Sequence, residues 1–137
     1  MELDVLIVDD DEDIREYTAD IMANWKGLGG QIKFKYHFAE DGMQALDLLH
    51  KNKYDLLIAD VKMPRLSGAQ LITALRTNKG ANQNIPTIII SGAPEAYVSE
   101  LQNEEWTDVF SLDKPIDQDK FGRVITFSVA IKMKQAG

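Results

Sequence analysis

Residues 3–11 read Leu-Asp-Val-Leu-Ile-Val-Asp-Asp-Asp, an apolar run that ends in three carboxylates. An almost unbroken apolar run predicts a β-strand that is covered on both faces, as in a parallel sheet. Two further apolar runs end in charged residues: residues 56–59 precede Asp60, and residues 109–112 precede Asp113-Lys114-Pro115. Because the carboxyl ends of parallel strands open into one crevice, we expect these charged side chains to converge in one pocket.

Short β-branched runs alternate with segments of helical periodicity along the whole chain. This alternation is typical of an α/β fold with a parallel sheet. Strands are expected over residues 3–8, 32–39, 54–59, 87–90 and 109–112, and helices are expected to begin near Asp13, Gly42, Ser67, Pro94 and Asp117. Half-exposed alternation over residues 32–39 predicts a strand at the sheet edge, and Gly27-Leu28-Gly29-Gly30 is expected to end the first helix. The sequence therefore predicts five strands and five helices in strict alternation.

Length and composition restrict the class of protein. The 137 residues suit one domain, residues 1–137, and the short segment after Pro115 suggests one helix and no output domain. A net charge of −7 argues against nucleic acid or an anionic membrane surface as a direct partner. The chain has no cysteine and no apolar stretch of about 20 residues. No signal peptide is expected, because residues 1–4 carry no basic side chain and the apolar run that follows is short. A cytoplasmic location without membrane contact is therefore expected.

Asp9, Asp10 and Asp60 are candidate metal ligands, although an aspartate at a strand end, such as Asp60, can also simply face water. Clustered carboxylates raise one another's pKa unless a cation is present, and Mg²⁺ is typically bound by one or two carboxylates together with water and phosphate oxygens. Met63-Pro64 forces an extended turn after Asp60. This turn is expected to present the backbone carbonyl of Lys62 as a further oxygen ligand. The adjacent Asp11 is expected instead to cap the helix that follows.

Ser91 and Lys114 are candidate contacts for a phosphoryl group in the same crevice. Ser91 ends an apolar strand and offers a hydroxyl donor, although a serine at a strand end more often caps a helix or turn. The small residues Gly92 and Ala93 would let a bulky group approach. Lys114 would supply a positive point charge against phosphate, although most lysines are solvated surface residues.

Taken together, these stretches resemble a response-regulator receiver domain of bacterial two-component signalling. The matching stretches are Leu6-Ile7-Val8-Asp9-Asp10, residues 54–64, Ser67-Gly68, residues 85–92, Asp113-Lys114-Pro115, and Ala39-Glu40-Asp41-Gly42 with Ala45-Leu46. The resemblance covers almost the whole chain. It implies a doubly wound, flavodoxin-like α/β fold with five parallel strands in the order 2-1-3-4-5 and five helices.

The resemblance also implies a phosphoacceptor switch that depends on Mg²⁺. Asp60 would accept a phosphoryl group from a histidine of a sensor kinase or phosphotransfer protein. Asp10 would ligate the metal directly, Asp9 mainly through water, and Lys62 through its backbone carbonyl. Ser91 and Lys114 would then hold the phosphoryl oxygens, in keeping with a reaction that needs positioning and charge neutralisation. Such a domain is expected to be no enzyme beyond its own phosphorylation and weak autodephosphorylation.

The chain departs from the family pattern at several positions. Ser111 stands three residues before Lys114, where the family has an aromatic switch residue, and Phe110 comes one place earlier. Either of the two could serve the switch position. Lys62 and Ala93 would border the path of the hydrolytic water. The segment from Trp25 to Phe34 is longer than typical and is expected to extend the first helix or the second strand.

Output is expected through a protein–protein surface. In this family the surface is the fourth helix, fifth strand and fifth helix, here about residues 95–132, which would bind a downstream protein target or form a homodimer of an otherwise monomeric domain. Two alternatives stay open. One is a magnesium-dependent phosphohydrolase that uses an aspartyl phosphate, disfavoured by Lys62 where such enzymes carry a second aspartate. The other is a pseudo-receiver that is never phosphorylated.

Overall fold

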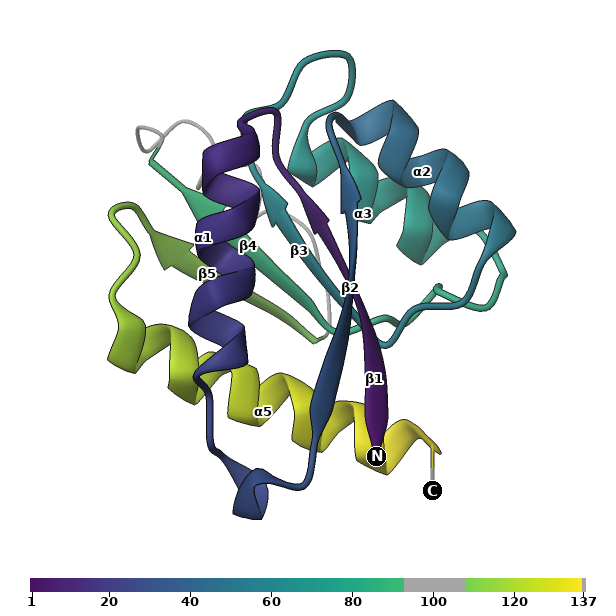
Figure 1. Cartoon of the computed structure of the whole chain (residues 1–137). Helices are drawn as coiled ribbons and strands as arrows, with labels where there is room; N and C mark the ends of the chain where they lie inside the picture. The colour runs from purple at the N-terminus through teal and green to yellow at the C-terminus, as the bar shows by residue number, and fades with distance from the viewer. Residues whose placement is uncertain (93–107, 137) are drawn as a thin grey trace.

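The computed structural model describes residues 1–92 and 108–136, and every structural statement below refers to these residues (Figure 1). The strands are β1 Glu2–Val8, β2 Lys33–Ala39, β3 Leu56–Asp60, β4 Thr87–Ser91 and β5 Val109–Asp113. The helices are α1 Glu12–Ala23, α2 Gly42–Lys51, α3 Gly68–Thr77 and α5 Gln118–Ala136, with a 3-10 turn at Leu28–Gly30. No helix within these ranges combines the length and the apolar character needed to cross a membrane. The helix expected near Pro94 lies outside the described residues.

The five strands form one parallel sheet in the order β2-β1-β3-β4-β5, which confirms the predicted topology. β1 lies between β2 and β3, and the pairing of Val8 with Ala59 aligns the carboxyl ends of β1 and β3. The strand order reverses between these two strands. In an open α/β sheet, the crevice at such a reversal is where ligands bind.

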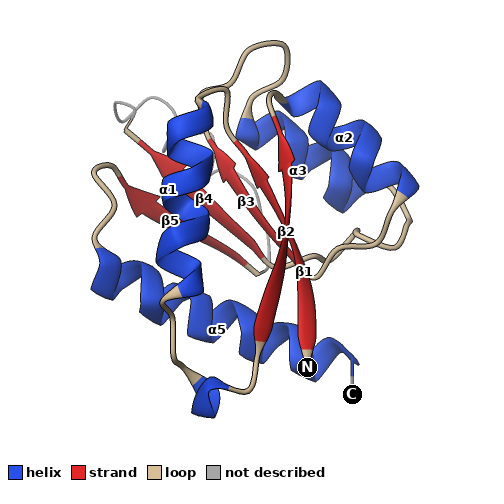
Figure 2. Cartoon of the chain, in the orientation of Figure 1, coloured by secondary structure: helices blue, strands red, loops and turns tan. Residues whose placement is uncertain are grey.

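Helices cover both faces of the sheet (Figure 2). α1 and α5 pack on one face, and α2 and α3 pack on the other. Alternate side chains of β1 divide between the two cores: Val5 and Ile7 face α1 and α5, whereas Leu6 and Val8 face α2 and α3. Burial on both faces explains the unbroken apolar runs, and the half-exposed β2 lies at the sheet edge as predicted.

Side-chain caps determine where the helices begin. Asp11, Ser67 and Asp117 each accept hydrogen bonds from backbone N–H groups in the first turn of α1, α3 and α5. A capping side chain satisfies donors that otherwise have no intrahelical partner. These contacts confirm the three predicted helix starts to within a residue.

The first helix ends earlier than the glycine-rich segment predicts. α1 stops at Ala23, and Gly27-Leu28-Gly29-Gly30 instead forms the separate 3-10 turn. Trp25 leaves the helix because its ring packs against Phe34, with centroids 5.4 Å apart, and its Nε1 donates to Thr126 Oγ1 at 3.2 Å. Tertiary packing of Trp25 therefore ends the helix. The long segment extends neither α1 nor β2.

Strand boundaries also differ from the expected ones. β3 begins at Leu56 rather than Tyr54, because the Tyr54 N–H donates to the side-chain oxygen of Asn82 at 2.9 Å instead of joining the strand ladder. At their other ends β3 and β4 each run one residue further, to Asp60 and Ser91. These two site residues are thus held by the sheet itself.

Replacing Ser128 by alanine is expected to raise the free energy of unfolding by about 1 kcal/mol, because the variant no longer buries a hydroxyl without a hydrogen bond. Ser128 is fully buried on α5, and within the described ranges its Oγ has no hydrogen-bond partner. Urea denaturation measures the change. Thr126→Ala is the matched control on the same helix; its hydroxyl bonds to Trp25 and Gly122, so this variant is expected to lose stability. A less stable Ser128→Ala protein would contradict the prediction.

Candidate functional site

A pocket of about 590 Å³ lies at the carboxyl ends of the central strands. Its lining residues come from the β1, β3, β4 and β5 ends and from the loop after β3: Asp10, Asp60, Lys62, Met63, Pro64, Gly92 and Lys114. The predicted convergence of strand-end residues is thus what the structure shows. A concave site with few polar groups is the usual form of a binding site.

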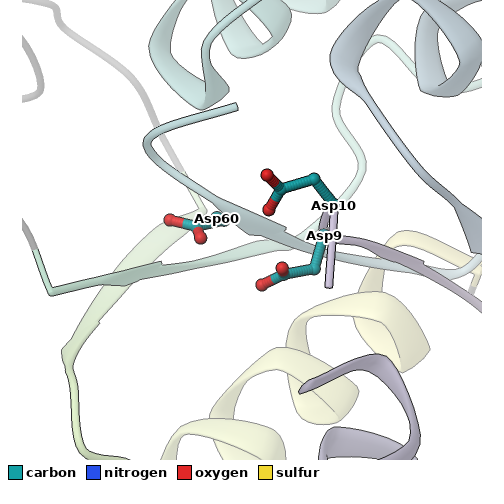
Figure 3. Close-up of side chains that lie close together, drawn as sticks. All are labelled: Asp9, Asp10 and Asp60. Carbon is teal, nitrogen blue, oxygen red and sulfur yellow. The ribbon is translucent and has the colours of Figure 1, made fainter. Parts of the chain in front are cut away.

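Three carboxylates gather at this pocket. Asp9 and Asp10 follow β1, and Asp60 ends β3, so the three side chains lie side by side (Figure 3). One carboxylate oxygen from each lies within 4.8 Å of the others. Asp9 and Asp60 are buried, whereas Asp10 is exposed. An all-oxygen donor set of this size fits a hard divalent cation such as Mg²⁺.

Lys114 compensates part of this negative charge. Its Nζ donates to Asp60 Oδ2 at 2.8 Å and lies 3.8 Å from Asp9 Oδ2. The Lys114 N–H donates to the Ser91 carbonyl at 2.8 Å, which ties the start of the β5–α5 loop to β4, and the Lys114–Pro115 peptide bond is cis. Burial alone would lower the pKa of Lys114, but the hydrogen bond and charge of Asp60, with the other carboxylates, raise it above its ordinary value.

Burial raises the pKa of Asp9 from 3.8 to about 6, against the opposing effect of the hydrogen bond that its carboxylate accepts from the Asp11 N–H. The charge of Asp60 raises it further. The folded protein therefore keeps this proton to a higher pH than the unfolded chain. The contribution of protonated Asp9 to the free energy of unfolding is therefore lost as the pH rises from about 4 to about 6, where Asp9 ionises in the folded state.

The shifted pKa of Asp9 predicts pH-dependent metal binding. Mg²⁺ affinity is expected to fall about tenfold between pH 7 and pH 5, because Asp9 contributes negative charge to the site only when deprotonated and its pKa is about 6. Isothermal titration calorimetry in a non-chelating buffer measures the dissociation constant. Asp9→Asn, which cannot titrate, is expected to bind more weakly but with a much smaller pH dependence. Equal wild-type affinity for Mg²⁺ at the two pH values would contradict the prediction.

Ser91 is the last residue of β4, and Lys62 lies in the loop after β3 and lines the pocket. Ser91 is buried at the end of β4 and precedes Gly92, which lines the pocket. A β-carbon on Gly92 would lie 3.2 Å from Lys114 Cδ, so the missing side chain leaves room for the lysine. The Lys62 N–H donates to Asp60 Oδ1 at 3.1 Å, which places the start of the loop after β3 against the carboxylate.

Two charged contacts near the site were missed by sequence reasoning. Arg15, on α1, donates from Nη1 to the Asp9 carbonyl at 2.7 Å. Arg65, in the loop after β3, pairs with Asp41 at 3.2 Å. Helical spacing could have suggested that Arg15 reaches back to the strand end. The second pair joins residues 24 positions apart, and no local pattern marks it.

Phe110 and Ser111 lie on opposite faces of β5. The Phe110 ring stacks on Phe127 of α5, with centroids 6.4 Å apart and an interplanar angle of 17°. Ser111 is exposed, and successive strand residues alternate between faces. Phe110 therefore belongs to the α5 face, and Ser111 occupies the position three residues before Lys114 without an aromatic ring.

The histidines lie on other parts of the chain. His37, on β2, places Nε2 3.0 Å from Asp4 Oδ1, and its ring meets Tyr54 edge-on at 5.3 Å. His50 is exposed near the end of α2. Of the two tryptophans, Trp25 packs as predicted, whereas Trp106 lies outside the described residues.

Residues 5–126 match the family model of the response regulator receiver domain. "Response regulator MprA" of Mycobacterium tuberculosis is 31% identical over 91 residues, which cover 66% of this chain and 35% of that protein. The chain thus spans about a third of the length of this curated relative. The receiver domain of Francisella response regulator 1452 is 31% identical, with a TM-score of 0.66 and coverage of 98% and 99% of the two chains. The signal receiver domain of an HD domain-containing protein from Pseudomonas fluorescens Pf-5 shares the fold. It is 21% identical, with a TM-score of 0.80 and coverage of 98% of this chain and 99% of that one.

Proposed function

From the membership of this chain in the response regulator receiver domain family, we propose that it is a phosphoacceptor switch of two-component signalling that is phosphorylated on Asp60. The observation that carries the proposal is the buried Asp60 carboxylate, which is paired with Lys114 at 2.8 Å beside two further carboxylates. The test is the intact mass after incubation with a small phosphodonor and Mg²⁺, with Asp60→Asn as the control.

The donor set supports magnesium as the cofactor. Asp10 and Asp60 would hold the ion with the Lys62 backbone carbonyl, and Asp9 would contribute mainly through water. The clustered oxygens within 4.8 Å and the raised pKa of Asp9 fit a site whose negative charge a divalent cation would compensate. When bound, the ion would neutralise negative charge on the phosphoryl oxygens.

In the proposed transfer, a carboxylate oxygen of Asp60 attacks the phosphorus of a phosphohistidine. A P–O bond forms as the P–N bond breaks, and the histidine nitrogen leaves with the electron pair. Lys114, which already donates to Asp60, would then neutralise a phosphoryl oxygen, and the Ser91 hydroxyl would donate to another. The small Gly92 leaves space for the added group. These residues stabilise charge and hold the group in position, which is what this chemistry requires.

The proposed partners are proteins. A sensor histidine kinase or a phosphotransfer protein would supply the phosphoryl group in the cytoplasm, and a downstream protein would read the switch. Part of the surface expected for output, residues 95–132, lies outside the described residues. Its described part carries Phe127, which is 60% exposed and stacks on Phe110. This apolar pair supports a protein contact there, with a target or with a second copy.

We further propose that the domain is no enzyme in the sense of turning over a separate substrate. Lys62 stands two residues after Asp60, where an aspartyl-phosphate phosphohydrolase usually has a second carboxylate. Its ammonium group cannot act as a general acid and base in the way a carboxyl group does near neutral pH. The phosphoryl group on Asp60 is therefore expected to leave only by slow hydrolysis or by onward transfer.

A further inference from the structure

We propose that the ion pair between Arg65 and Asp41 is a latch that holds the loop between β3 and α3 in the conformation that the magnesium site needs. Arg65 and Asp41 would then be positioning residues for phosphorylation, although neither lines the pocket. The inference rests on the proposed function, because that function assigns the Lys62 carbonyl of this loop to the metal.

Both ends of the loop are fixed by backbone contacts. At the start, the Lys62 N–H donates to Asp60 Oδ1 at 3.1 Å. At the end, the Gly68 N–H donates to the Val61 carbonyl at 2.9 Å, and a β-carbon on Gly68 would lie only 2.7 Å from the Asp60 carbonyl oxygen. The ends are thus closely packed against the strand. The middle of the loop needs a separate anchor.

The middle of the loop adopts a conformation that its sequence does not favour. Arg65 has φ of +72°, in the left-handed region, which is unfavourable for a residue with a side chain. The adjacent Leu66 N–H donates to the Pro64 carbonyl at 2.8 Å. Strained backbone of this kind persists where surrounding contacts impose it, and it occurs often at functional sites. The contact that engages the Arg65 side chain is Asp41, at 3.2 Å.

Asp41 connects the loop to α2. Its Oδ1 caps the helix by accepting the Gln44 N–H at 2.7 Å, and its Oδ2 receives Arg65. Its side chain is only 17% exposed, so the carboxylate is fixed in place. A β-carbon on Gly42 would collide with the Leu66 carbonyl, which shows how closely the loop lies on the start of α2. The two oxygens of one carboxylate therefore anchor helix and loop to each other.

The effect of the latch is expected to be local. The Arg65 side chain is 65% exposed, and an exposed ion pair contributes little to global stability. The proposed role of the ion pair is to restrict the loop, so that the Lys62 carbonyl is already oriented for the metal before Mg²⁺ binds. Holding a site in its bound conformation lowers the ordering cost of binding.

Two asparagine substitutions separate the latch from its surroundings. Asparagine tolerates the left-handed region, so Arg65→Asn removes the charge with little added strain. Asp41→Asn keeps an oxygen that can cap α2 but removes the charge that pairs with Arg65. Each variant is expected to weaken Mg²⁺ binding about 2- to 5-fold, the range that a surface ion pair supports. Calorimetric titration with Mg²⁺ measures the change in affinity. The double variant is expected to bind Mg²⁺ no more weakly than either single variant. The conservative variant Arg65→Lys is expected to recover part of the affinity.

If Arg65 and Asp41 acted only through their charges, the two variants would differ in their effects on Mg²⁺ binding. Removing the cation Arg65 near a carboxylate site would tighten Mg²⁺ binding, whereas removing the anion Asp41 would weaken it. The latch predicts weaker binding in both variants. Unchanged or tighter binding by Arg65→Asn would overturn the inference, and so would additive losses in the double variant.

Amide hydrogen exchange without Mg²⁺ provides a second readout. Both asparagine variants are expected to exchange faster than wild type at Lys62 and Leu66, with unchanged exchange in α1. This readout separates the two proposals. A wild-type protein that binds no Mg²⁺ would defeat the proposed function, whereas unchanged exchange in the loop would defeat the latch.

Discussion

Replacement of Lys114 by methionine is expected to lower the free energy of unfolding of the metal-free protein by about 2 kcal/mol at pH 7. The variant leaves Asp9 and Asp60 buried without their cation, and an uncompensated buried charge is strongly destabilising. The loss of stability is expected to be smaller than for a fully buried ion pair, because the Lys114 side chain is 30% exposed. Methionine keeps most of the aliphatic contact with Gly92, so packing changes little.

Mg²⁺ is expected to restore most of this loss. A cation that binds only the folded protein stabilises it in proportion to its affinity, and the affinity rises when a competing ammonium group is removed. Urea denaturation of both proteins with and without Mg²⁺ measures the effect, with the exposed Lys120→Met as the matched control. The loss should also shrink toward pH 4, because Asp9, with a pKa of about 6, takes up a proton there. Equal stability of Lys114→Met and wild type without metal would contradict the account.

The strands and several helix starts were predictable because their determinants are local, whereas the strand order came from the family resemblance. Apolar runs such as residues 56–59 identify strands that are covered on both faces, and Asp11 and Ser67 mark helix starts through caps that involve only neighbouring residues. The end of α1 was not predictable in the same way. It depends on Trp25, whose partners Phe34 and Thr126 come from other elements. Helix ends that are set by tertiary packing carry no local signal.

The centre of the site was also predictable, because topology brings strand ends together. Asp9 and Asp60 needed only the assumption of a parallel sheet with adjacent β1 and β3, and Lys114 needed the same assumption for β5. The face on which Phe110 lies depends on its packing against Phe127. The pairing of Arg65 with Asp41 depends on a left-handed backbone that the arginine itself does not favour.

Phosphorylation of Asp60 has the largest expected effect, because wild type should be modified completely and the Asp60→Asn variant not at all. Wild-type protein incubated with a small phosphodonor and Mg²⁺ should gain the mass of one phosphoryl group. Asp60 is the carboxylate that Lys114 contacts at 2.8 Å and that lines the pocket, so the group should attach there. Asp60→Asn keeps the side-chain size and the acceptor for the Lys62 N–H but removes the nucleophilic carboxylate oxygen. A chelator should abolish the gain in wild type, because charge neutralisation is lost.

The most direct measurement is the intact mass of wild type and Asp60→Asn after the same incubation, with the modified residue located by fragmentation. One phosphoryl group is expected on wild type, on Asp60, and none is expected on the variant. Wild type that remains unmodified in Mg²⁺, or a variant that gains the same mass, would show that these clustered carboxylates do not form a phosphoacceptor site.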